Sequence, residues 1–116
     1  MFDFIAQQGE VRIRKIAAIP SNAETKSHTE KVQAGVIISH SESGHHHCLT
    51  GGDVMERTNN VPAGMRILYA ILDKPEALIQ DAPTPHESVK LDPGFYEFRL
   101  SREFDPFAEQ ARRVAD

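Results

Sequence analysis

The sequence Met65-Arg66-Ile67-Leu68-Tyr69-Ala70-Ile71-Leu72 carries apolar side chains at both odd and even positions. Successive side chains of a β-strand point to opposite faces of the sheet, so both faces of this segment must be covered. We therefore expect residues 65–72 to form a central strand of a β-sandwich or barrel, or a strand whose outer face is covered by a partner.

Two strands with a turn between them are predicted downstream. Residues 88–91 alternate polar and apolar, and Asp92-Pro93-Gly94 has the composition of a turn. After the turn, Tyr96, Phe98 and Leu100 alternate with Glu97, Arg99 and Ser101. This pattern predicts that the two segments form a hairpin.

Proline positions limit the remaining downstream segments. Residues 74–79 are interpreted as a short strand or a single helical turn, since Pro83 and Pro85 follow closely. From Asp105 onward, Pro106 and the apolar residues at helical spacing predict a short amphipathic C-terminal helix.

Upstream segments also favour strands. Residues 11–18 alternate with a phase slip at residues 14–16, which predicts a half-buried strand with a bulge. Residues 20–31 are polar and predict an exposed loop, in which His28 is a solvated residue. The run Val36-Ile37-Ile38 predicts a strand buried on both faces. The apolar segment 1–8 either pairs at a sheet edge or docks onto another subunit.

These elements predict an all-β fold, a small antiparallel β-sandwich or barrel with a short C-terminal helix, as a single β domain over residues 1–116. The formal net charge of −4, with no basic run, argues against nucleic-acid binding. One cysteine cannot form an internal disulfide, and no apolar stretch is long enough for a signal peptide or a membrane span. We therefore expect a cytoplasmic protein.

The segment Ser39-His40-Ser41-Glu42-Ser43-Gly44-His45-His46-His47-Cys48 holds four of the six histidines and the only cysteine. If residues 45–49 form a strand, His45 and His47 project from one face about 6.6 Å apart, while His46 points away. Two such imidazoles can converge on one cation. The alternative is that this Ser, Gly and His-rich run is a solvated turn.

Two histidines do not complete a metal site, so a further ligand is needed. His86 is the candidate third ligand, with His40 or Glu42 as the fourth ligand or as a partner of the ligands. Imidazole-rich ligation suits Zn, Ni, Fe or Cu. The alternative for His86 is a turn residue in a proline-rich loop. Cys48 is expected to be a small core residue rather than a ligand or nucleophile.

A further hairpin is predicted at residues 51–52. Residues 45–49 and 53–57 are expected to pair with each other across this Gly-Gly turn.

Several motifs in the chain resemble a family of small bacterial proteins of uncharacterised function. The motifs are Val36-Ile37-Ile38, Gly44-His45-His46-His47, His86, Leu91-Asp92-Pro93-Gly94-Phe95-Tyr96, Arg102-Glu103-Phe104-Asp105-Pro106 and Arg112-Arg113-Val114-Ala115-Asp116. The resemblance singles out these histidines without implying a reaction.

A looser similarity is to cupins, whose His-x-His on a barrel strand binds metal. Cupins carry a Glu about four residues after the second His, where this chain has Gly51 and its nearest Glu is Glu56. The similarity is therefore one of geometry.

Three functions follow from these features. The first is a metal-binding β protein of unassigned activity, with His45, His47, His86, His40 and Glu42 as candidate ligands. The second is a structural or assembly subunit, for example one derived from a phage, that forms a homo-oligomer through its apolar strands and Phe-rich ends. The third, ranked last, is a metal-free acid/base enzyme using His47 or His86 with Glu42 or Glu87.

Overall fold

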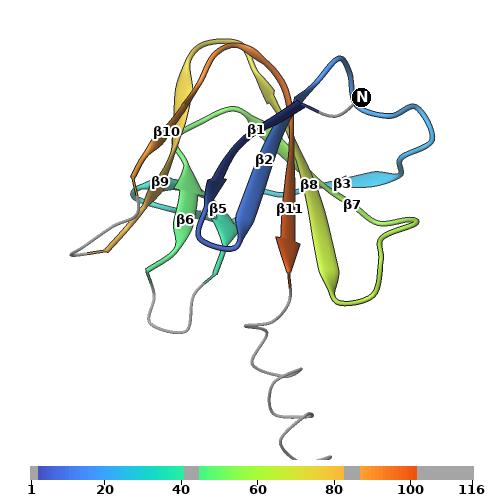
Figure 1. Ribbon diagram of the computed structural model, residues 1–116, viewed down its shortest axis with the longest axis horizontal. Helices are drawn as coiled ribbons and strands as arrows, with labels where there is room; N and C mark the ends of the chain where they lie inside the picture. Colours follow the sequence, from blue (N-terminus) through green and yellow to red (C-terminus); the bar gives the residue numbers. More distant parts are fainter. Residues whose placement is uncertain (1–2, 41–44, 83–86, 102–116) are drawn as a thin grey trace, which may run out of the picture.

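The computed structural model describes residues 3–40, 45–82 and 87–101. In this part of the chain, strands form two antiparallel sheets (Figure 1). The six-stranded sheet has the order β1 (Asp3–Gln8), β2 (Val11–Ile16), β11 (Gly94–Ser101), β8 (Met65–Leu72), β7 (Asp53–Arg57), β3 (Thr25–Ser27). The five-stranded sheet has the order β10 (Val89–Leu91), β9 (Glu76–Gln80), β6 (His47–Leu49), β5 (Gly35–Ser39), β4 (Lys31–Val32). The all-β prediction is confirmed, while the predicted helix from Asp105 lies outside the described residues.

Strand β8 is central, as its two-sided apolar pattern predicts. It pairs with β11 on one side and β7 on the other, with the bounds expected from the sequence. Leu68 and Ala70 belong to the core, and Ile67 and Tyr69, which alternate with them, are buried as well. The hydroxyl of Tyr69 accepts a hydrogen bond from Arg57 Nη1 at 3.2 Å. Both faces of β8 are therefore covered.

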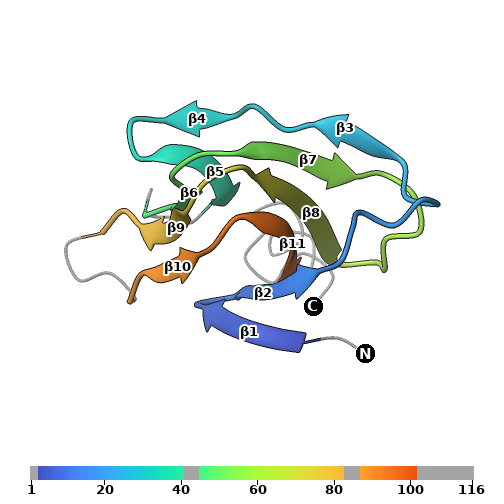
Figure 2. The same cartoon turned by 90° about the horizontal axis from the view of Figure 1, so that it is seen from above.

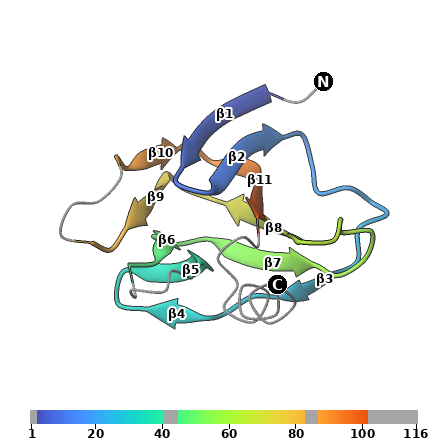
Figure 3. The same ribbon diagram turned by 60° about the horizontal axis from the view of Figure 1, so that its bottom comes forward.

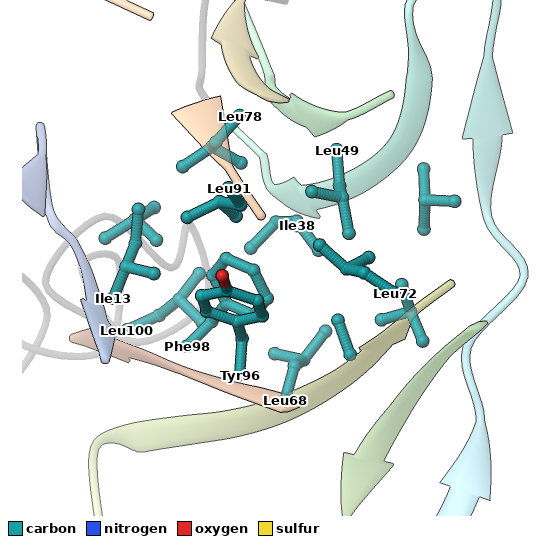
Figure 4. Close-up of a cluster of buried hydrophobic side chains, with 14 residues drawn as sticks. Ile13, Ile38, Leu49, Leu68, Leu72, Leu78, Leu91, Tyr96, Phe98 and Leu100 are labelled. Atoms are coloured by element: carbon teal, nitrogen blue, oxygen red, sulfur yellow. The ribbon is translucent and has the colours of Figure 1, made fainter. Parts of the chain in front are cut away.

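The hydrophobic core lies between the two sheets. Figure 4 shows side chains from β2, β8 and β11 directed toward side chains from β5, β6, β9 and β10. Phe98 is fully buried at its centre. Burying each large side chain of this kind contributes about 1.5–3 kcal/mol of favourable transfer free energy. The arrangement is consistent with a sandwich.

One acidic residue departs from the pattern predicted for β11. Glu97 alternates with core residues, a position at which a charged side chain ordinarily faces solvent, yet it is only 3% exposed. Its carboxylate accepts hydrogen bonds from Arg14 Nη2 at 2.7 Å and Arg99 Nε at 2.5 Å. A buried carboxylate is tolerated when it is paired in this way.

The two predicted hairpins, one across residues 92–94 and one across residues 51–52, are both wrong. β10 pairs with β9, whereas β11 pairs with β2 and β8 in the other sheet. Likewise β6 pairs with β5 and β9, whereas β7 pairs with β3 and β8. The turn composition indicated that the chain reverses, but at these corners it also passes from one sheet to the other.

Several smaller expectations also change. The strand predicted over residues 11–18 ends at Ile16, and the register shift lies in β1 between Phe4 and Ala6. The predicted loop 20–31 contains β3 and reaches β4, two short edge strands. Residues 76–80 form a strand, β9, rather than a helical turn. Strand β1 pairs with β2 at a sheet edge, which was one of the two alternatives for the N-terminal segment.

The outer strands lie at opposite sides of the molecule. Figure 2 shows the edge strands β3 and β4 along one side, and the opposite edge strands β1 and β10 toward the other side. No helix in the described part of the chain has the length and apolar character that crossing a bilayer requires.

Candidate functional site

His47 is the first residue of β6 and is almost completely buried. Its neighbours across the five-stranded sheet are Ser39 of β5 and Gln80 of β9. Its ring Nδ1 lies 2.7 Å from Gln8 Oε1, and its Nε2 lies 3.6 Å from Glu10 Oε2. Both ring nitrogens therefore face polar groups of the other sheet, namely Gln8 at the end of β1 and Glu10 in the turn that leads to β2.

The role of His47 Nδ1 in its hydrogen bond follows from the orientation of Gln8. The Gln8 side-chain amide donates to the carbonyl oxygens of Leu78 and Glu87, each at 3.0 Å. The amide nitrogen is thereby committed, so its oxygen faces His47 and must accept the hydrogen bond. His47 Nδ1 is consequently the donor, which leaves Nε2 directed toward Glu10.

Glu10 completes this buried polar group. Its Oε1 accepts a hydrogen bond of 2.6 Å from the hydroxyl of Ser39. The pKa of Glu10 is lowered from 4.5 to about 2, chiefly by the interaction of its carboxylate with His47. The Ser39 hydrogen bond lowers the pKa further, whereas partial burial opposes the change. Gln8, Glu10, Ser39 and His47, which we call the buried polar network, thus link the two sheets through side chains.

The lowered pKa predicts an acid-sensitive contribution to stability. A carboxyl whose pKa is depressed in the folded state stabilises it above the unfolded-state pKa, and this contribution is lost as pH falls through the folded-state value. For Glu10 the window runs from about pH 4.5 down to about pH 2. Because 3.6 Å is an ion-pair distance rather than a tight hydrogen bond, we expect only about 1–2 kcal/mol to be lost.

Urea unfolding of the native chain and of Glu10→Gln, followed from pH 6 to pH 2 by circular dichroism, measures this contribution. Glu10→Gln is expected to be the less stable protein at pH 6, with the difference shrinking through the window above. A difference independent of pH would contradict the ionic role of Glu10.

His40 and His46 form a second group, on the surface. The rings meet edge to face with their centroids 4.8 Å apart. His40 Nε2 donates a hydrogen bond of 2.6 Å to Glu30 Oε1, and these two side chains are 47% and 52% exposed. This bond is the main cause that lowers the Glu30 pKa, while burial is the main cause that lowers the pKa of His46. We call Glu30, His40 and His46 the surface histidine group.

Backbone contacts fix the three segments that carry this group. Glu30 precedes β4, and its carbonyl accepts a hydrogen bond from Ile37 N at 2.9 Å. His40 directly follows β5 and His46 directly precedes β6. The carbonyl of His46 accepts a hydrogen bond from Asp81 N at 3.0 Å. The three side chains therefore project from anchored strand ends.

The positions of the predicted ligands differ from those expected if residues 45–49 formed a strand. Strand β6 begins at His47, so His45 lies before it and the alternation that placed both on one face does not apply. His46, expected to point away, is the residue that meets His40. Glu42 and His86 lie outside the described residues. Cys48 is fully buried, and burial raises its thiol pKa, which confirms it as a core residue.

Among residues 3–40, 45–82 and 87–101, no three His, Cys, Asp or Glu side chains are already arranged around a common metal position. Sequence reasoning missed Gln8, Glu10 and Glu30 as partners of the histidines. These residues lie 10 to 39 positions from their histidine partners, so no local spacing reveals them. His28, predicted to be a solvated loop residue, instead donates from Nε2 to the Ile37 carbonyl at 2.6 Å.

The family model called Domain of unknown function (DUF8820) matches residues 7–101 of the 116-residue chain. The chain belongs to this family. The match spans β2 to β11 and the segments of both histidine groups, and it ends before the predicted terminal motif at residues 102–116. Membership of an uncharacterised family is thereby confirmed, while the individual motifs stay predictions. No curated protein and no solved structure matches the sequence.

Proposed function

We propose that the DUF8820 chain binds one divalent transition-metal ion at the surface histidine group. The observation that carries this proposal is the 4.8 Å contact between the rings of His40 and His46, with the Glu30 carboxylate 2.6 Å from His40 Nε2. Two imidazoles and a carboxylate form a donor set that zinc commonly uses, and imidazole also suits Ni, Fe and Cu.

An ion can enter this group with little rearrangement. In the hydrogen bond between His40 and Glu30, the proton occupies the position that a metal ion would take. Zinc bonds to imidazole nitrogen and carboxylate oxygen at about 2.0–2.2 Å. The two side chains would have to separate slightly to admit it. Both are about half exposed, so a change of rotamer does not disturb the core. The anchored backbone would keep the donors together during this change.

Further ligands can complete the coordination. Water, His45, or the predicted ligands Glu42 and His86 would fill the positions that the surface histidine group leaves open. His47 is the candidate that the proposal leaves out, because its ring nitrogens face Gln8 and Glu10. The proposal concerns binding and assigns no reaction.

The test is metal content and zinc affinity of untagged protein purified without a metal-affinity step. We expect near-stoichiometric metal by elemental analysis, and zinc binding by the chelator-stripped protein in isothermal titration calorimetry. His40→Ala and His46→Ala should each weaken zinc binding by at least about tenfold, since even indirect partners of a metal ligand are worth 10- to 100-fold.

Glu24→Gln is the matched control, because Glu24 is an exposed carboxylate outside the surface histidine group. It should bind zinc as the native chain does. Absence of zinc binding by the native chain, or unchanged affinity in His46→Ala, would refute the proposed site.

The alternative of a metal-free assembly subunit has less support from the described residues. Among the side chains whose burial the structure describes, in residues 6–40, 45–82 and 87–100, Val32 is the only large apolar one that is exposed. The two-sided apolar strand β8, which suggested an interface, is buried within the chain itself. The Phe-rich ends that also suggested one are not described, so homo-oligomer formation stays a prediction.

A further inference from the structure

A cavity of about 410 Å3 lies where the chain passes from the six-stranded to the five-stranded sheet. Figure 3 shows this passage, in which β3 and β4 run along the edge beside β7 and β5. The volume is within the range of about 300–1,000 Å3 that small-molecule sites occupy. None of the surface histidine group lines the cavity, so it is separate from the proposed metal site.

The inner wall of the cavity is apolar and rigid. Val36 and Val54, which belong to the hydrophobic core, line it together with Met55 and Ile71. These residues come from β5, β7 and β8, three strands of the paired sheets. An apolar ligand group placed here would be removed from water against a surface that is already packed.

Hydrogen bonds hold the outer wall in place without a ligand. His28, which lines the cavity, donates from its backbone N to the Val54 carbonyl at 2.9 Å. Its ring donates to the Ile37 carbonyl at 2.6 Å, so this one residue is tied to both sheets. A preformed site avoids the entropy cost of ordering a loop on binding.

The rim of the cavity carries two opposite charges. Lys31 comes from β4 and Asp53 from β7, and both are exposed. Within the described residues, neither side chain has a hydrogen bond or an ion pair, so the two do not pair with each other. Each charge therefore remains available to a ligand group of opposite sign.

Hydroxyl groups add to the polar rim. Thr25, Ser27 and Thr29 line the cavity, and the described residues offer their hydroxyls no hydrogen-bond partner. By contrast, the hydroxyls of Ser39 and Thr50 are engaged by glutamates elsewhere in the molecule. The rim thus combines a cation, an anion and polar donors around an apolar wall.

We propose that this cavity binds a small zwitterion with an aliphatic body, of the kind represented by a free aliphatic amino acid. Lys31 contacts the carboxylate of the ligand, Asp53 contacts its ammonium group, and the wall of Val36, Val54 and Ile71 receives the aliphatic side chain. A purely anionic or cationic ligand would satisfy one rim charge and be repelled by the other.

The probe is L-leucine, titrated into the full chain in EDTA and followed by backbone amide NMR. The chelator separates this test from the metal proposal, because none of the surface histidine group lines the cavity. Saturable shifts are expected at Lys31, Val54 and Ile71 at millimolar leucine. Leucinamide, N-acetyl-leucine and glycine, which lack the carboxylate, the ammonium group and the aliphatic body respectively, should each bind more weakly.

Lys31→Gln and Asp53→Asn test the two charges. Each variant should weaken leucine binding by about two- to fivefold, the range that an exposed ion pair supports. Lys74→Gln and Asp73→Asn, exposed residues outside the cavity, are the matched controls and should bind as the native chain does. Absence of saturable shifts, shifts confined to other residues, or equal losses in the controls would overturn the proposal.

Discussion

Replacing His47 with alanine is expected to lower the free energy of unfolding by about 3 kcal/mol or more, as for other broken buried polar pairs. The change removes a side chain that is 2% exposed and leaves Gln8 Oε1 and Glu10 without the ring that faces them. The measurement is urea unfolding at pH 7, followed by far-ultraviolet circular dichroism because the chain contains no tryptophan.

His40→Ala is the matched control for this prediction. His40 is also a histidine with a carboxylate partner, but its side chain is 47% exposed. Exposed pairs of this kind contribute at most about 1 kcal/mol. A double variant with Gln8→Ala should lose less than the sum of the single losses, because the two side chains share one hydrogen bond. Equal losses in His47→Ala and His40→Ala would show that the buried polar network has no special structural role.

Gly35→Ala is expected to have the other large effect, a loss of more than about 3 kcal/mol, since it combines a steric clash with an unfavourable backbone conformation. Gly35 begins β5 with φ at +141°, where side chains are disfavoured. An added Cβ would lie 2.1 Å from the Leu49 carbonyl oxygen. That oxygen belongs to a paired strand, so relief requires separating β5 from β6.

Gly64→Ala provides the comparison that isolates the clash. Gly64 also has a positive φ, +77°, but nothing lies within 4 Å of its added Cβ. Its loss should be about 1–2 kcal/mol, the cost of a left-handed conformation alone. Thermal and urea unfolding of both variants measure the difference. Similar losses at the two positions would mean that strand β5 shifts to accommodate the methyl group.

The strands of this protein were predictable where burial alone sets the pattern. Residues 65–72 carry apolar side chains on both faces, and β8 has those bounds. Pairing was not predictable at residues 51–52 and 92–94, because a turn sequence does not encode whether the next strand joins the same sheet. Glu97 was misjudged for a related reason, since its burial depends on Arg14, a residue 83 positions away.

The candidate site was only partly predictable. Histidine density drew attention to residues 40–47, which supply the histidines of both groups, His40, His46 and His47. Assigning individual roles depended on where β6 begins, because β6 starts at His47 and the strand alternation therefore does not place His45 and His46. The end of a strand depends on its partners in the neighbouring strands, which for His47 are Ser39 and Gln80. The sequence around His47 does not indicate which residues these partners are.

The position of β11 in the six-stranded sheet has a consequence for synthesis of the chain. β11 lies between β2 and β8 in the sheet, although it is the last of the described strands to be synthesised. While residues 94–101 are still inside the ribosome, β2 and β8 each retain an unpaired edge, and the sheet cannot close. Exposed edges of this kind can pair with other nascent chains. Slower translation therefore prolongs the interval of exposure, and chaperones that shield strand edges become important before the final strand emerges.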